Sequence, residues 1–312
     1  MDPLADNLTR RAALGTLAVL TACATRPASG SIATADAVLT TPEGRAVSYR
    51  AAWPRGRRGP LGLVLLSHGA NGTLDGLANL IEAFAADRIV AAPLHVDGEG
   101  HPQFGKTDRS AVTSLRLADM RLLLDNIGAI ERLSATRIDR ARIAAAGHSY
   151  GGLIAQALGG AEIGMPGEPM RSHRDPRVRA VAAFSPPGPI AGYFGRDGWA
   201  KLAVPMFVQT GTADVLPMIA ATWEAHAMAY EASAVPGSVL WAGHGVDHYF
   251  GNLIQRPTRQ APDQRVHFDA AMAIARAFLD ARLDDDRGAV RWLAGGGPRE
   301  RYTALTARYE VK

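Results

Sequence analysis

Residues 147–152 read Gly147-His148-Ser149-Tyr150-Gly151-Gly152. They follow a short apolar run, 142–146, and precede a segment with helical character, 153–158. A Gly-x-Ser-x-Gly pattern between a strand and a helix is typical of a nucleophile elbow, a turn so tight that it lifts the serine hydroxyl clear of the edge of a sheet. A chain with 33 glycines also produces this pattern by chance, so the partners that would activate Ser149 have to be found elsewhere.

The composition limits the class of protein. Of the 312 residues, 47% are hydrophobic and 21% are charged, which suits one large α/β domain with a substantial core. The formal net charge of +4 is modest, and we interpret the arginines of segment 55–58 as a solvated loop. The nine histidines lack the spacing of a metal site. We therefore expect no nucleic-acid partner, no metal and no cofactor, and the sequence leaves the oligomeric state open.

The amino terminus differs in character from the rest of the chain. Thr9-Arg10-Arg11-Ala12-Ala13-Leu14 resembles a twin-arginine signal, and an apolar run over 12–20 ends in Leu20-Thr21-Ala22-Cys23, which resembles a bacterial lipobox. We predict an export signal over 1–23, lipidation of Cys23 with attachment to a membrane, and a tether over 24–33. Cleavage after Ala24 without lipidation is the alternative. Either reading predicts a periplasmic or cell-envelope protein.

Strands and helices alternate along the remaining sequence. Apolar runs predict strands over 37–41, 46–52, 61–67, 89–93, 142–146, 178–185, 204–210 and 238–242. Helical periodicity predicts helices over 77–86, 109–133, 216–230 and 263–283. This order predicts an α/β domain over 34–283 with a mostly parallel sheet and helices on both faces. Segments 159–177 and 186–200 are irregular, and we expect the second to form a lid; 284–312 is left unassigned.

A serine nucleophile needs a base and an acid, and after a nucleophile elbow they follow in the order Ser, Asp, His. Asp214 follows the predicted strand 204–210, so we predict it as the acid, with a helix N-cap as the alternative. Two histidines, His244 and His248, follow the last predicted strand. We favour His248, which precedes two aromatic residues, but the choice stays open.

The oxyanion of an acyl-transfer intermediate needs two N–H donors. The first long buried strand leads into the stretch Leu66-Ser67-His68-Gly69-Ala70-Asn71-Gly72. This stretch resembles a loop that supplies one of the two N–H donors. We predict the N–H groups of Ala70 and Tyr150 as the pair. His68 is interpreted as a buried, hydrogen-bonded turn residue rather than a catalyst.

Taken together, these features resemble the α/β-hydrolase superfamily over residues 34–283. Ser67-His68-Gly69, the 147–152 stretch and Arg116-Leu117-Ala118-Asp119-Met120-Arg121 look like the dienelactone hydrolase and platelet-activating-factor acetylhydrolase-like group. That resemblance implies an α/β-hydrolase fold and hydrolysis of small esters without metal or cofactor. Dienelactone enzymes proper use a cysteine nucleophile, whereas this elbow carries Ser149, so muconate-lactone chemistry is not expected.

The sequence thus predicts an exported serine carboxylesterase that acts on a small-molecule ester. An acyltransferase or a peptidase on the same fold remains an alternative, because acceptor choice depends on how the lid excludes water. A non-catalytic surface binding module on a hydrolase scaffold is the other alternative. The sequence does not predict the acyl chain or the alcohol.

Overall fold

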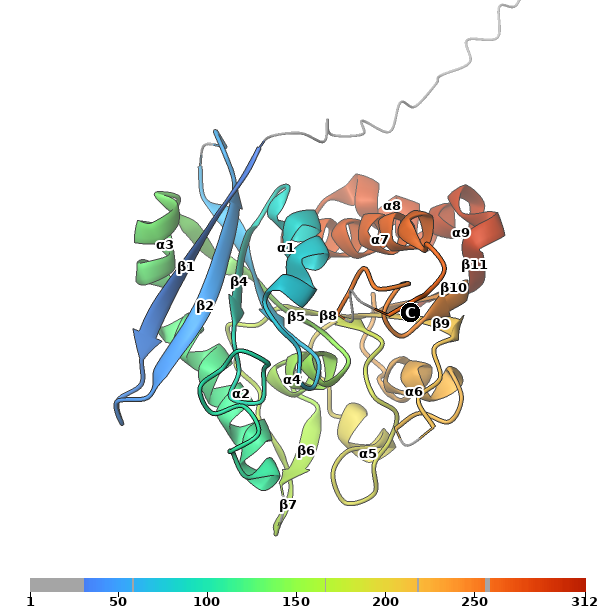
Figure 1. The fold of residues 1–312 in the computed structure, drawn as a ribbon. Coiled ribbons are helices and arrows are strands. Elements are labelled where there is room, and N and C mark those ends of the chain that lie inside the picture. Colours follow the sequence, from blue (N-terminus) through green and yellow to red (C-terminus); the bar gives the residue numbers. More distant parts are fainter. Residues whose placement is uncertain (1–30, 58, 166, 218, 256–258) are drawn as a thin grey trace, which may run out of the picture.

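Strand β5 (Ile138–His148) lies at the centre of a nine-stranded sheet with the order β1-β2-β4-β3-β5-β8-β9-β10-β11 (Figure 1). The structure is a computed structural model, and it describes residues 31–57, 59–165, 167–217, 219–255 and 259–312. The strands from β4 to β10 in this order are parallel, whereas β1, β2 and β11 pair antiparallel at the two edges. The predicted mostly parallel sheet is therefore observed.

The other strands of this sheet are β1 (Ile32–Thr40), β2 (Ala46–Pro54), β3 (Leu61–Ser67), β4 (Ile89–Pro93), β8 (Ala180–Phe184), β9 (Met206–Ala213), β10 (Val239–Asp247) and β11 (Thr306–Val311). A separate hairpin pairs β6 (Glu162–Met165) with β7 (Glu168–Ser172). The α-helices are α1 (Ala78–Ala85), α2 (Arg109–Asp125), α3 (Ile127–Ser134), α4 (Tyr150–Leu158), α5 (Arg196–Trp199), α6 (Glu224–Ala232), α7 (Arg265–Leu283), α8 (Arg287–Ala294) and α9 (Gly297–Arg301). Two short 3-10 turns, η1 (Asp75–Leu77) and η2 (Thr303–Leu305), complete the chain order.

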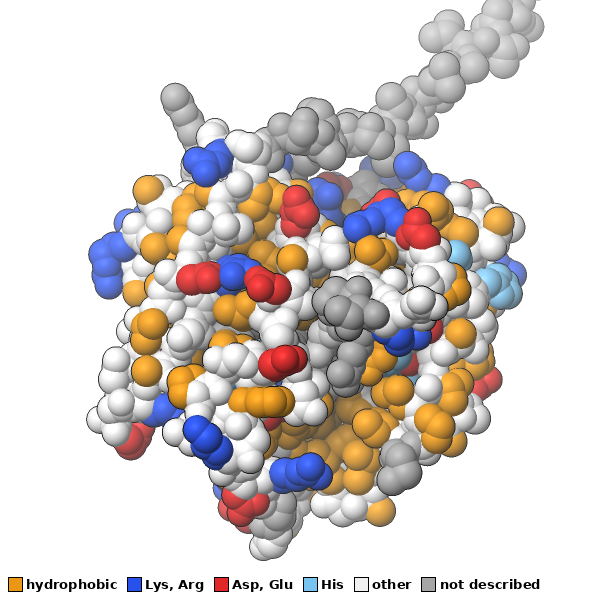
Figure 2. Space-filling view, viewed as in Figure 1, with side chains coloured by type: hydrophobic (Ala, Val, Ile, Leu, Met, Phe, Trp, Pro, Cys, Tyr) orange, Lys and Arg blue, Asp and Glu red, His pale blue; other side chains and the backbone are white. Residues whose placement is uncertain are grey.

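Two apolar cores lie on opposite faces of the sheet, because neighbouring residues of a strand point to opposite sides. In β3, Leu63 and Leu65 pack with α2, α3, α4 and α6, whereas Val64 and Leu66 pack with α1 and α7. Figure 1 shows α1 and α7 above the central strands of the sheet and α2, α4 and α6 below them. All seven residues of β3 are buried, which explains its continuous apolar run. On the face seen in Figure 2, acidic and basic side chains are interspersed among uncharged ones.

Two predicted helices differ in the structure. The predicted helix 109–133 is divided into α2 and α3 at Asn126, whose side chain donates to the Leu122 carbonyl at 2.8 Å and competes with the helical backbone bonds. The predicted helix 216–230 begins only at Glu224, because Leu216 and Ala220 exchange two backbone hydrogen bonds and close a tight loop.

The predicted irregular segments also contain regular elements. Segment 159–177 contains the β6–β7 hairpin, and segment 186–200 ends in the short helix α5. Segment 284–312, which the sequence left unassigned, forms α8, α9 and β11. Since β11 pairs with β10, this segment belongs to the same sheet.

The predicted export signal 1–23, including Cys23, and most of the predicted tether lie outside the described residues. Strand β1 begins at Ile32, two residues before the predicted start of the domain. Within the described part of the chain, every helix is too short or too polar to cross a membrane.

Deleting residues 306–312 tests the role of β11. The deletion removes one of the two strands that pair with β10, and it removes the 2.9 Å bond from Trp241 Nε1 to Thr306 Oγ1. Because β10 leads to His248, we expect the melting temperature to fall by about 5 °C or more. Thr306→Val, which removes that bond and the 2.9 Å bond from Thr306 Oγ1 to the Tyr302 carbonyl but keeps the strand, should lower it by about 2–4 °C. Equal melting temperatures for the truncated and full chains would contradict this role.

Candidate active site

Ser149 occupies the turn between β5 and α4 with a strained backbone, at φ 53° and ψ −122°. Its N–H donates to the Phe184 carbonyl at 2.8 Å, and its own carbonyl accepts from the Gly152 N–H at 2.8 Å. The side chain is only partly buried. A non-glycine residue with positive φ in a sharp strand-to-helix turn matches the predicted elbow geometry, which exposes the hydroxyl at the end of the strand.

The two outer glycines of the elbow are required by close backbone contacts. A Cβ at Gly147 would lie 2.2 Å from the carbonyl carbon and oxygen of Gly151. A Cβ at Gly151 would lie 2.0 Å from the Ser67 carbonyl oxygen at the end of β3. These distances are far below van der Waals contact, so no larger residue fits at either position without moving the backbone.

Asp214 and His248 come together beyond the ends of the neighbouring strands β9 and β10. Asp214 Oδ1 lies 2.8 Å from His248 Nδ1, and its Oδ2 accepts a 2.9 Å bond from Thr210 Oγ1. Both side chains are buried. Burial raises the pKa of Asp214, but its close contacts with His226 and His248 outweigh burial and hold the pKa well below its usual range. Asp214 is therefore a carboxylate that can orient an imidazole.

His148, the residue before Ser149, connects the elbow to the loop that carries His248. His148 Nε2 donates to the His248 carbonyl at 2.7 Å, and the two rings lie 4.8 Å apart between centroids. Burial, together with the nearby His248, lowers the pKa of His148 to about 4. His148 is thus neutral at neutral pH, and its Nδ1 lies 3.0 Å from Gln255 Oε1. This bond holds the backbone of His248 beside the residue that precedes the elbow serine.

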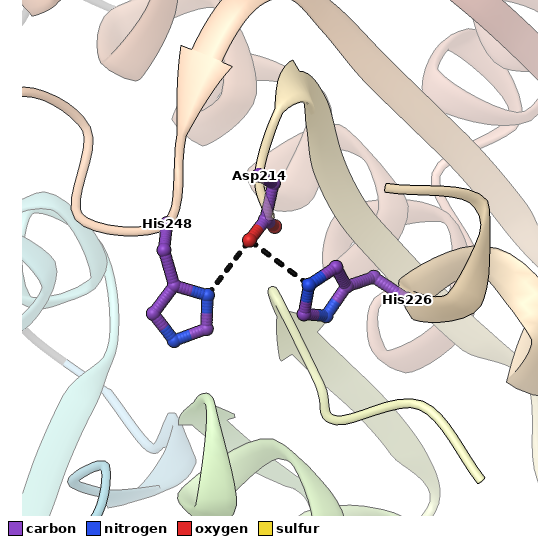
Figure 3. Close-up of side chains that lie close together, drawn as sticks. All are labelled: Asp214, His226 and His248. Carbon is purple, nitrogen blue, oxygen red and sulfur yellow. Dashed lines mark hydrogen bonds and ion pairs between the residues drawn. The ribbon is translucent and has the colours of Figure 1, made fainter. Parts of the chain in front are cut away.

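Asp214 has a second histidine partner, His226 from α6 (Figure 3). Its Nε2 lies 3.0 Å from Asp214 Oδ1, a distance typical of an ion pair but without the alignment of a hydrogen bond. Its Nδ1 donates to the Pro186 carbonyl at 2.6 Å. The side chain is completely buried. The sequence analysis placed this residue in a helix and gave it no role.

Asp214, His226 and His248 offer one carboxylate and two imidazoles, a donor set that zinc accepts. The spacing argues against a shared ion. Ligands about 2.1 Å from a tetrahedral metal stand roughly 3.4 Å apart, whereas Asp214 Oδ1 lies 2.8 Å and 3.0 Å from the two nitrogens. We therefore describe the cluster as a buried hydrogen-bonding and ion-pair network.

The predicted oxyanion donors lie in the loop after β3 and at the start of α4. Among the described residues, neither the Ala70 nor the Tyr150 N–H has a hydrogen-bond acceptor, so both are available to a ligand. The neighbouring Gly69 N–H is occupied by Gln255 Oε1 at 2.9 Å. A cavity of about 630 Å³ adjoins this loop and is lined by Asn71, Gly72, Thr73, Leu74, Asp75, Arg50, Leu94, Glu99, Gly100 and Gln255.

Arg116 braces both donor elements. Its guanidinium donates to the Gly69 carbonyl at 2.9 Å and to the His68 carbonyl at 2.5 Å, and it lies 4.5 Å from the centroid of the Tyr150 ring. Asp97 pairs with it at 2.8 Å. The side chain of Arg116 is completely buried. It therefore connects the loop that carries Ala70 to the residue that follows Ser149.

A second Ser–His–Asp chain lies beneath the loop after β3. Ser67 Oγ is 2.9 Å from His95 Nε2, and His95 Nδ1 is 2.8 Å from Asp119 Oδ2. All three side chains are completely buried, so no substrate reaches this serine. These three hydrogen-bonded side chains support the loop after β3. His68 is buried and hydrogen-bonded in the same loop, as the sequence analysis interpreted it.

The segment expected to act as a lid touches the elbow through tyrosines. Tyr150 and Tyr193 hydroxyls lie 3.1 Å apart, and both contact the Thr113 hydroxyl. Burial raises the pKa of Tyr150 well above its usual range, so the phenol is neutral. Segment 186–200 therefore borders the candidate site.

The structure thus brings Asp214 and His248 together and places Ser149, Ala70 and Tyr150 on the adjoining turns. His244, the other candidate base, is exposed to solvent near the end of β10. The sequence analysis missed His226 and Gln255 altogether. It quoted Arg116 and Asp119 only as part of a resembling motif, and spacing alone gave no sign that both are buried.

Comparison with known proteins finds no matching protein family and no matching curated protein. Among solved structures, the chain is similar to one described as a candidate dienelactone hydrolase from Klebsiella pneumoniae. The TM-score is 0.57 at 18% identity, and the match covers 80% of this chain and 98% of the other. The likeness is one of fold, and it confirms the predicted α/β-hydrolase fold.

Gly147→Ala tests whether backbone contact at the elbow is essential. Since the added methyl group would meet the Gly151 backbone, we expect the free energy of unfolding to fall by about 3 kcal/mol. Gly128→Ala in α3 is the matched control, because the nearest atom to its Cβ is the flexible Arg132 Nη1 at 3.6 Å. This control should gain about 0.5–1 kcal/mol. Urea unfolding measures both, and equal stabilities would refute the argument.

Proposed function

We propose that this chain is a serine hydrolase that cleaves carboxylic esters, with Ser149 as nucleophile, His248 as base and Asp214 as acid. The observation that carries the proposal is the 2.8 Å contact between Asp214 and His248 beyond adjacent parallel strands, with the His248 backbone bonded to the residue before Ser149. The strained conformation of Ser149 supports the same assignment. The α/β-hydrolase fold does not by itself identify a substrate, because proteins with one fold carry out many activities.

The proposed reaction begins when Ser149 Oγ attacks the ester carbonyl carbon and His248 Nε2 takes the hydroxyl proton. Collapse of the tetrahedral intermediate breaks the bond to the alcohol, and His248 donates its proton to the departing oxygen. Water then attacks the acyl-enzyme while His248 accepts a proton from it. The carboxylic acid leaves and the proton returns to Ser149 Oγ, so the enzyme ends unchanged.

Negative charge develops on the carbonyl oxygen in both halves of this reaction. We assign its stabilisation to the N–H groups of Ala70 and Tyr150, which have no other acceptor in the described chain. Tyr150 is the first residue of α4, so the positive end of the helix dipole faces the same position. Asp214, held ionised by its two histidines, would stabilise the imidazolium of His248 in the transition state.

We also propose that the protein works in the cell envelope on a small-molecule ester. The support is the twin-arginine pattern at Arg10 and Arg11 and the lipobox that ends at Cys23. A lipid on Cys23 would attach the protein to a membrane surface. Mass spectrometry of the exported protein tests this directly, since lipidation leaves Cys23 as the modified amino terminus.

Ester hydrolysis by the full chain tests the proposal. We expect release of p-nitrophenol from esters in the range from acetate to palmitate, fastest on short acyl chains. Ser149→Ala and His248→Ala should each lower kcat by about 1,000-fold or more. Ser110→Ala and His244→Ala, which alter exposed residues, are the matched controls and should keep the full rate.

A fluorophosphonate probe gives an independent readout, because it labels an activated serine whatever the substrate. Labelling should be lost in Ser149→Ala and kept in Ser110→Ala. A folded protein that neither turns over an ester nor reacts with the probe would refute the hydrolase and favour a binding module. Acyl transfer to added alcohols or amines in preference to water would instead identify a transferase or peptidase.

A further inference from the structure

His226 places a second imidazole against the acid of the candidate triad. We propose that His226 is a positioning residue: a charged imidazolium, held between the Asp214 carboxylate and the Pro186 carbonyl, that shifts the activity of His248 as a base toward lower pH. The inference rests on the proposed function and extends it to the pH range of the same site.

The hydrogen-bond partners of His226 decide its protonation. Nδ1 lies 2.6 Å from the Pro186 carbonyl oxygen, which only accepts, so Nδ1 carries a proton. Nε2 lies 3.0 Å from Asp214 Oδ1. Without a second proton, Nε2 would present a lone pair to a carboxylate in a site closed to water, and the two would repel. With that proton, the same contact becomes an ion pair.

The charges around His226 favour this second proton. Burial lowers the pKa of His226, but the close contact with the Asp214 carboxylate and its negative charge outweigh burial and raise the pKa above its ordinary value. His248, beyond β10, is the other titratable group that faces it, with ring centroids 5.5 Å apart. From α5, Arg196 pairs with Glu231 on the outer side of α6. Within the described chain, Asp214 is thus the one acidic group that we find against His226.

The position of His226 determines the sign of its effect on His248. A lone Asp214 carboxylate would favour the imidazolium form of His248 strongly. A cation on the same carboxylate offsets much of that attraction and repels a second positive ring. The acidic limb of the activity profile is therefore expected at a lower pH in this chain than in a variant with a neutral residue 226.

The Pro186 contact gives His226 a second positioning role. Pro186 follows β8 by two residues and begins segment 186–200. Because the Pro186 carbonyl bonds to Nδ1 and Asp214 faces Nε2, one ring fixes the acid relative to the start of this segment. A neutral side chain that bonds to only one of these partners would lose one of the two links.

Histidine ring nitrogen NMR tests the charge without any turnover. In the full chain labelled with ¹⁵N at histidine, we expect one ring protonated on both nitrogens at pH 7.5, and we expect that signal to disappear in His226→Gln. If no ring is doubly protonated at pH 7.5, or if such a ring persists in His226→Gln, the proposal is wrong. The first of these outcomes needs no folded variant.

The pH profile of kcat/KM for p-nitrophenyl acetate tests the consequence. In His226→Gln, which keeps an N–H donor but no charge, the acidic limb should move up by about 1 pH unit. His173→Gln is the matched control, because His173 is a buried histidine on the loop between β7 and β8, and its limb should not move. A folded His226→Gln with an unmoved limb would overturn the proposal, since a purely structural role changes the rate but not the limb.

The two proposals fail in different ways. If Ser149→Ala keeps full activity, the hydrolase mechanism is wrong, yet the NMR signal of His226 still reports whether the ring is charged. If Ser149→Ala is inactive and the limb does not depend on residue 226, the hydrolase stands and the role of His226 is wrong.

Discussion

The approach of the Gly151 backbone to the end of β3 is the constraint on which the site depends. A Cβ at Gly151 would lie 2.0 Å from the Ser67 carbonyl oxygen, so the elbow and the end of β3, which leads into the next loop, approach too closely for any side chain at Gly151. Ser149 and the N–H of Tyr150 belong to the first of these segments, and Ala70 belongs to the second. The contact therefore sets the distance between the proposed nucleophile and the proposed oxyanion donors. This close contact requires the strained positive φ of Ser149. The surrounding sheet has to stabilise that strained conformation.

Buried polar side chains then hold the loops at this edge of the sheet together. Arg116 bonds to the backbone carbonyls of the loop after β3 and covers the Tyr150 ring, while Gln255 bonds to the Gly69 N–H. His148 bonds to the backbone of His248. Each is buried among partners and would be expensive to leave unpaired. A single loop thus cannot move without breaking bonds to its neighbours, which is the preorganisation that transition-state stabilisation requires.

The sequence allowed the fold and the core of the candidate site to be predicted because their signals are local. Strand ends can be read from apolar runs, and Ser149, Asp214 and His248 each lie just after such a run. His226 has no local signal, since its role arises from the contact of α6 with a loop after β9. The helix predicted over 216–230 was wrong at its start because Leu216 and Ala220 bond to each other. Likewise, β11 joins the sheet by pairing with β10. The residue pattern within 306–311 alone does not predict this pairing.

The segment expected to act as a lid is attached at two points, and this bears on how a substrate is selected. Its first residue, Pro186, bonds to His226, and Tyr193 contacts the hydroxyls of Tyr150 and Thr113. One attachment leads to Asp214, the proposed acid, and the other to the residue after Ser149, the proposed nucleophile. Displacement of the segment would therefore disturb both ends of the proposed catalytic set at once. If the proposed function holds, a segment attached in this way would select substrates by its shape while the proposed triad keeps its geometry, whereas a free lid would have to close before each turnover.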